Sequence, residues 1–259
     1  MKIALQMFSL HKIMKQEDGL RKALRYAAEA GYDGVEFAGF FNLTPEEIKC
    51  ELDQNGLEAA GLHVGWAPIQ LENLENNPED VLRIAKILGL QSITVASFNG
   101  KTREEWANFA ARIDRIGQTF RENGIPLGYH NHRHELKPLP TEPDGENVID
   151  LFLGMCKPEN VFWELDTRHV VVAGKDPVEF AKKYAGRIPF IHAHDAEKIT
   201  GEDSALDCAV GYGIVDNKTA IEVSGDHKWL IVEESPADTE EHSLRNIRMS
   251  QEYLRKHFG

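Results

Sequence analysis

The chain is 259 residues long, and 42% of its residues are hydrophobic while 27% are charged. This length and composition fit one soluble α/β domain, and no apolar run is long enough to span a bilayer. The formal net charge of −13 comes without a visible cluster of Lys and Arg, which excludes a broad nucleic-acid interface because phosphates need clustered cations.

The N-terminus and the cysteines both bear on the cellular compartment. The first ten residues, MKIALQMFSL, hold a short apolar stretch that Lys12 and Lys15 soon follow, and no small-residue cleavage site is present. We predict a first strand here rather than a secretory signal, and a cytoplasmic protein. Cys50, Cys156 and Cys208 form no C-x-x-C pair, which argues against a disulfide framework and against a cysteine-based zinc site.

Short β-rich runs alternate with longer amphipathic segments along the whole chain. The pattern predicts strands at residues 2–8, 33–37, 57–64, 92–97, 125–130, 161–166, 188–194 and 229–233. It predicts helices at about 18–30, 44–55, 78–88, 102–123, 145–156, 176–185, 216–224 and 239–257.

Local signals mark the ends of these helices. Asp18 and Thr44 are candidate N-caps, and Pro45 suits a first helical position. Glycines that follow a helical stretch and precede a strand favour a left-handed C-cap, and they are Gly31, Gly56, Gly89 and Gly124.

Eight strand–helix units at a spacing of about 25–35 residues predict a single (β/α)8 TIM barrel over residues 1–259. A doubly wound open sheet would usually carry a G-x-G-x-x-G loop after its first strand. No such loop follows Phe8, and no linker or shift in composition divides the chain.

Residues that ligate metals gather where these strands end. In a parallel barrel the carboxyl ends of the strands form the active face. Seven of the eleven histidines fall there, namely His63, His130, His132, His134, His169, His192 and His194. Carboxylates share these ends at Glu135, Asp166, Asp195 and Glu233. A mixture of imidazole and carboxylate predicts one divalent ion, such as Mn²⁺, Mg²⁺, Co²⁺ or Zn²⁺.

Four segments carry a resemblance to a known family. They are YHNHRHEL at 129–136, ELDTRHVVVAGKDP at 164–177, GRIPFIHAHDA at 186–196 and WLIVEES at 229–235. They resemble strand-end motifs of the xylose isomerase-like TIM barrel superfamily, in particular its sugar phosphate isomerase/epimerase group. The similarity runs through nearly the whole chain and implies a metal-dependent enzyme of carbohydrate metabolism.

The resemblance implies a ligand set, residue by residue. Asp166, His192 and Glu233 match the family's metal ligands. Many relatives place a Glu where this chain has His130, so the fourth ligand is open between Glu135, which we favour, and His130. His132 and His169 then fall beside the metal, where the family positions substrate hydroxyls or a developing oxyanion.

Other residues at the strand ends are candidates for binding substrate. Phe8 and Trp66 would wall a sugar pocket, and Arg168 would meet a phosphate if the substrate carries one. His63 and His194 end the third and seventh strands, facing the same pocket. Glu164, two residues before Asp166, should point into the barrel as part of an interior polar layer.

The leading hypothesis is a metal-dependent isomerase or epimerase of a keto sugar or sugar derivative. The ion would polarise the carbonyl. Glu233 and Glu135 are the candidate acid/base pair that would remove a proton to give an enediolate and then return a proton to it. A lyase that dehydrates a keto-inositol or dehydroshikimate shares the first step and is the alternative. We expect the protein to bind a small sugar and to bind neither nucleic acid nor a membrane. Whether it forms a homo-oligomer is left open.

Two other functions are less favoured. An apurinic endonuclease of the same superfamily needs extra His ligands on early strands. His63 is present, but the fourth strand ends in VASFNG without a His. A non-catalytic sugar-binding barrel would keep the aromatics and lose Asp166, His192 and Glu233, all of which are present.

Overall fold

The computed structural model describes residues 1–202 and 204–259. Eight parallel strands close into a barrel in the order β1-β10-β7-β6-β5-β4-β3-β2. These strands are β1 (Ile3–Gln6), β2 (Gly34–Phe37), β3 (Glu58–Val64), β4 (Ile93–Val95), β5 (Leu127–His130), β6 (Val161–Asp166), β7 (Phe190–Ala193) and β10 (Trp229–Val232). The eight predicted strands and the (β/α)8 barrel are confirmed.

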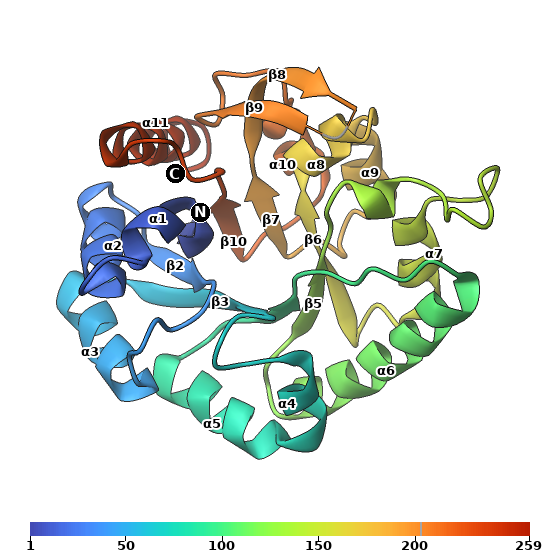
Figure 1. Cartoon of the computed structure of the whole chain (residues 1–259), viewed down its shortest axis with the longest axis horizontal. Helices are drawn as coiled ribbons and strands as arrows, with labels where there is room; N and C mark the ends of the chain where they lie inside the picture. The colour runs from blue at the N-terminus through green and yellow to red at the C-terminus, as the bar shows by residue number, and fades with distance from the viewer. Residues whose placement is uncertain (203) are drawn as a thin grey trace.

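Helices form a ring outside the barrel (Figure 1). The eight predicted ones are α2 (Gly19–Glu29), α3 (Pro45–Asn55), α5 (Pro78–Leu88), α6 (Arg103–Glu122), α7 (Val148–Met155), α9 (Pro177–Lys183), α10 (Asn217–Val223) and α11 (Glu240–Phe258). Each buries an apolar face, as α6 does with Trp106, Phe109, Ile113 and Phe120 at helical spacing. Among the described residues, no helix is long and apolar enough to cross a membrane.

Several short elements lie outside the predicted pattern. They are η1 (Met7–Leu10), α1 (His11–Met14), α4 (Leu71–Asn76), η2 (His134–Leu136), α8 (Thr167–Val172) and the antiparallel hairpin of β8 (Asp195–Gly201) and β9 (Ser204–Cys208). The hairpin stands at the rim in Figure 1. Most of these elements span seven residues or fewer after a barrel strand, too short for periodicity to reveal.

The predicted helix ends are confirmed with one exception. Thr44 caps α3 in a reciprocal capping box with Glu47, and Pro45 begins the helix. All four predicted C-cap glycines have left-handed backbone angles. Asp18 is the exception, because its own φ is 51° and its side chain caps no helical N–H. It pairs with Arg21 instead.

Inside the barrel, an apolar layer, called the floor here, lies beneath a polar layer. The floor is a cluster of Ala4, Ala60, Phe162, Phe190, Trp229 and Ile231. The Phe162 ring packs directly against the backbone of Gly128, where an added Cβ would lie 2.2 Å from the ring. Because inward side chains alternate along each strand, the next inward positions on β6 and β7 are Glu164 and His192.

The contrast between Thr44 and Asp18 gives a stability prediction. Thr44→Ala should destabilise the protein by about 1 kcal/mol because it removes a side-chain N-cap. Asp18→Asn should change stability by less than about 0.5 kcal/mol, because Asn tolerates a left-handed backbone and only an exposed ion pair is lost. Urea unfolding of both variants checks this, and equal losses would contradict the capping assignment.

Candidate metal centre

Four side chains converge at the carboxyl ends of neighbouring strands. His130 ends β5, Asp166 ends β6, His192 lies on β7, and Glu233 follows β10. Each offers one ligand atom, and these atoms all lie within 4.8 Å of one another. His192 Nδ1 lies 2.7 Å from Glu233 Oε2. The structure thus brings the three ligands implied by the resemblance together with His130.

Alternation along β10 sets the direction of two adjacent carboxylates. Glu233 lines the cavity above the barrel. Glu234 is buried on the other side of the strand, where Ser250 of α11 donates a hydrogen bond to it at 2.7 Å. Burial raises the pKa of Glu234 to about 8, despite that hydrogen bond. Glu234 therefore faces away from the barrel interior, as alternation of side chains along a strand requires.

Glu135, the preferred fourth ligand, does not lie in the group of Asp166, His192 and Glu233. The hydroxyl of Tyr129 donates to Glu135 Oε1 at 2.7 Å, and the backbone N–H of His132 donates to Oε2 at 2.9 Å. Both oxygens are engaged in bracing the loop after β5, and the side chain is fully buried. His130, the alternative, takes the place beside Asp166, His192 and Glu233.

Two further imidazoles stand next to this group. The rings of His132 and His169 have centroids 4.9 Å apart, and the His132 ring is 5.1 Å from that of His130. Burial lowers the pKa of His132 to about 2 and that of His169 to about 4, so both are neutral at pH 7.

The residues present fit a divalent ion. In the described part of the chain, the Nδ1 atoms of His132 and His169 are buried without a hydrogen-bond partner, and that of His130 has only a 3.5 Å contact with Glu164 Oε2. A buried, unpaired nitrogen costs free energy, so a ligand at this place would be favoured. Two imidazoles and two carboxylates also form a donor set for a borderline cation.

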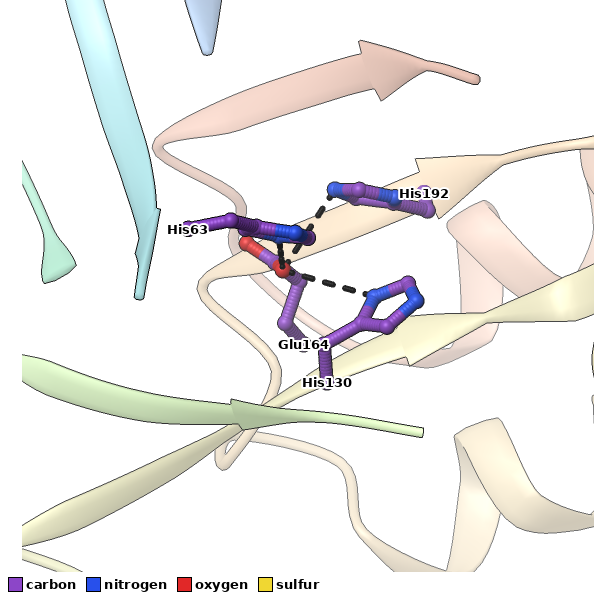
Figure 2. Close-up of side chains that lie close together, drawn as sticks. All are labelled: His63, His130, Glu164 and His192. Atoms are coloured by element: carbon purple, nitrogen blue, oxygen red, sulfur yellow. Dashed lines mark hydrogen bonds and ion pairs between the residues drawn. The ribbon is translucent and has the colours of Figure 1, made fainter. Parts of the chain in front are cut away.

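A second buried layer lies below the candidate centre. Glu164 Oε2 is 2.7 Å from His63 Nε2, and Figure 2 shows the rings of His63, His130 and His192 directed at this carboxylate. Burial alone would lower the pKa of His63, but Glu36 and Glu164 raise it to about 10. Glu164 thus lies inside the barrel, as predicted.

Sequence reasoning missed Glu36, which shares this layer. Glu36 Oε2 lies 2.8 Å from His192 Nε2 and 3.2 Å from His63 Nε2. Burial favours its neutral form, yet the charges of the two histidines hold its pKa well below the usual value. The available signal was a lone charged residue inside an apolar strand, GVEF.

A cavity of about 340 Å³ opens above the group. Gln6, His63, His132 and Glu233 form its polar side, while Phe8 and Trp66 form an aromatic side, with ring centroids 5.7 Å apart. His63, Phe8 and Trp66 are therefore placed where a substrate would bind. No Lys or Arg is among the described residues that line it.

Arg168 and His194, which were expected at the substrate pocket, are not among the described residues that line the cavity. Arg168 pairs with Asp207 of the hairpin and donates to the carbonyl of Ala205 at 3.1 Å. His194 bridges Asp166, at 2.9 Å, and Asp207, at 3.1 Å. Both side chains thus hold the hairpin through Asp207, and His194 links it to Asp166 of the candidate centre. Sequence reasoning missed Asp207 because it did not predict the hairpin.

The sequence profile of one family, the xylose isomerase-like TIM barrel, matches residues 24–257. The chain belongs to this family. It is 26% identical to an inosose dehydratase of Lacticaseibacillus casei, over 87% of this chain and 85% of that protein. An inosose dehydratase of Geobacillus kaustophilus is 24% identical, with coverages of 90% and 85%.

Solved structures show the same architecture. A sugar phosphate isomerase/epimerase of Parabacteroides distasonis superposes with a TM-score of 0.78 at 25% identity, over 98% of this chain and 93% of that one. The IolI protein, whose crystal structure has a bound zinc atom, superposes over the whole of both chains with a TM-score of 0.73 at 16% identity. The family thus includes enzymes named for different reactions.

The choice between His130 and Glu135 can be tested by metal retention. We expect the wild-type protein to carry about one divalent ion per chain. His130→Ala should lose most of this metal, because the substitution removes a ligand. Glu135→Gln should retain the ion, because Glu135 only braces a loop. Elemental analysis of both purified variants checks this. Loss of metal in Glu135→Gln alone would return Glu135 to the ligand set.

Proposed function

We propose that this protein is a metal-dependent lyase that removes water from a keto sugar or keto-polyol. The observation that carries the proposal is a single carboxylate, Glu233, in the cavity wall beside the candidate metal group. The relatives named inosose dehydratase, which align over most of both chains, support it.

His130, Asp166, His192 and Glu233 would hold the ion, and the zinc atom of the IolI structure supports a metal in this fold. Their mixture of imidazole and carboxylate suits Mn²⁺, Co²⁺ or Zn²⁺ better than Mg²⁺. A divalent ion bound there would polarise a substrate carbonyl and acidify the adjacent C–H bond.

Glu233 is the proposed base. Burial disfavours its charge, but the hydrogen bond and charge of a protonated His192 hold its pKa well below the usual value, and a divalent ion bound in place of that proton would act in the same direction. It is therefore ionised at neutral pH and ready to take the proton next to the carbonyl. His132, which lines the same cavity as a neutral imidazole, can donate its N–H to a substrate oxygen.

Elimination needs one carboxyl group in the cavity, and that is why we favour it. The C–H bond breaks, its electron pair forms a C=C bond, and the C–O bond to the neighbouring hydroxyl breaks. The proton that Glu233 has taken can then pass to the leaving hydroxyl on the same face, and water departs. Epimerisation by two carboxylates needs a second one on the opposite face, and Glu135 is withdrawn from the cavity.

An isomerase or epimerase on the same site is the second candidate. The Parabacteroides distasonis protein of that name, which covers nearly all of this chain, supports it. In an isomerisation Glu233 would return the proton it has taken to the neighbouring carbon on the same face, so that no second carboxylate is needed. Both reactions begin with the same proton abstraction, and the fold alone does not set the fate of the intermediate.

The substrate is proposed to be uncharged. The described cavity lining offers no Lys or Arg, and Arg168 is held by Asp207. Three buried carboxylates, those of Glu36, Glu164 and Asp166, lie near the reacting end together with the partly exposed Glu233. Because His63, His192 and His194 pair with these carboxylates, it is the lack of Lys and Arg in the described lining that disfavours a phosphate ester.

Glu233 and Glu234 allow a matched test of the base. Glu233→Gln keeps the size of the side chain and one oxygen, and it should lower proton exchange by at least roughly 10²–10⁴-fold, the usual contribution of a general base. Glu234→Gln should be nearly silent, because the raised pKa of Glu234 keeps its carboxyl neutral at pH 7. Solvent deuterium exchange into a keto-inositol, with Mn²⁺ present and metal content measured, checks both variants. Exchange lost only in Glu234→Gln would sink the assignment.

The products distinguish the two candidate reactions. Incubation with a keto-inositol and Mn²⁺ should yield a product lighter by one water, seen by mass spectrometry, and a ketose phosphate should bind much more weakly. Deuterium exchange that ends in an isomer or epimer, without water loss, would favour the second candidate. No exchange with any keto sugar of a broad panel would contradict both.

A further inference from the structure

In the layer of Glu36, His63 and Glu164 below the candidate centre, the two carboxylates have no role in the proposed reaction. Its members are 0–5% exposed and come from β2, β3 and β6. Ionisable groups buried so deeply are costly to keep unless they hold something in place. Their contacts lead to two members of the candidate metal group, to His192 by the shorter contacts and to His130 through Glu164 at 3.5 Å.

His192 is held at both ring nitrogens. Its Nε2 is 2.8 Å from Glu36 Oε2, while its Nδ1 faces Glu233 Oε2 at 2.7 Å. A histidine that binds a metal must present a lone pair at one nitrogen, and it usually donates the other N–H to a carboxylate or carbonyl. Donation of Nε2–H to Glu36 therefore leaves the Nδ1 lone pair on the side of Asp166 and Glu233.

We propose that Glu36 is a positioning residue for metal binding. By accepting the Nε2–H of His192, it fixes the tautomer and the ring orientation in which Nδ1 ligates the divalent ion. The inference rests on the proposed metal-dependent function and adds to it a residue that does not itself touch the ion.

The surroundings of Glu36 are built to hold it in this place. Gln6 Nε2 donates to Glu36 Oε2 at 2.7 Å, so the same oxygen that faces His192 is fixed from β1. The β2–β3 pairing shifts register between Val35 and Glu36, which sets Gly61 opposite Glu36. A Cβ at Gly61 would lie 2.6 Å from Glu36 Oε1, closer than real contacts allow.

Glu164 provides a matched control in the same layer. It is as fully buried as Glu36, but its short contact is to His63, at 2.7 Å, while His192 Nε2 lies 3.4 Å away. Thr94 also donates to its other oxygen at 3.3 Å. A substitution at Glu164 thus disturbs the layer to a similar extent without removing the principal acceptor of His192.

The test measures metal affinity rather than activity. Wild type, Glu36→Ala, Glu36→Gln and Glu164→Gln are titrated with Mn²⁺ and with Co²⁺ against a competing chelator, with circular dichroism and urea midpoints as checks on folding. Glu36→Ala should bind about 10–100-fold more weakly, the usual effect of removing such a partner. Glu36→Gln should recover part of the affinity because its amide oxygen still accepts, and Glu164→Gln should stay within a few-fold of wild type.

The visible spectrum of bound Co²⁺ separates positioning from simple structural support. It should shift in Glu36→Ala, because the His192 ring is free to turn, and stay unchanged in Glu164→Gln. The inference would be overturned if Glu36→Gln and Glu164→Gln lost metal affinity equally and the Co²⁺ spectrum of Glu36→Ala did not shift. Two ions per wild-type chain, one of them lost in Glu36→Gln, would overturn it too, because Glu36 would then be a ligand. A wild type that binds no ion would fail the proposed function itself.

Discussion

Carboxylates hold both nitrogens of His192, and the rest of the candidate site is arranged around that ring. Glu233 stands at Nδ1 and Glu36 at Nε2, although they come from β10 and β2 on either side of β1. These contacts require strands that are distant in sequence to present inward residues at matching heights. A closed parallel barrel meets the requirement because the register of each strand is fixed by two neighbours. A slip of one residue would turn these side chains outward.

The layers above and below give this ring its electrostatic setting. Phe162, Phe190 and Trp229 close the barrel beneath the polar layer, so little water screens the charges from below. Glu36 and Glu164 therefore interact strongly with His63 and His192, since charge interactions grow as the local dielectric falls. Above, the cavity stays open between a polar side and an aromatic side. A substrate would thus meet the centre from one direction only.

The loops after β5 and β7 account for most of the differences between the site implied by the family resemblance and the site in the structure. After β5, Glu135 is turned away to brace its own loop through Tyr129, which leaves imidazoles on that side of the cavity. After β7, the hairpin brings Asp207 onto His194 and Arg168. A barrel can accommodate such loops because the candidate ligands lie on or directly after its strands. That is how one fold can serve dehydratases and epimerases alike.

The sequence by itself determined the alternation of strands and helices, the glycine C-caps, and the placement of Asp166, His192 and Glu233 at strand ends. These are local properties, carried by periodicity and by short motifs. Only the tertiary structure placed His130 rather than Glu135 beside Asp166, His192 and Glu233. It also held Arg168 and His194 by the hairpin and revealed Glu36, whose partner His192 is 156 residues away. Local pattern shows which side of a strand a residue faces. What it meets there depends on the register and closure of the whole barrel.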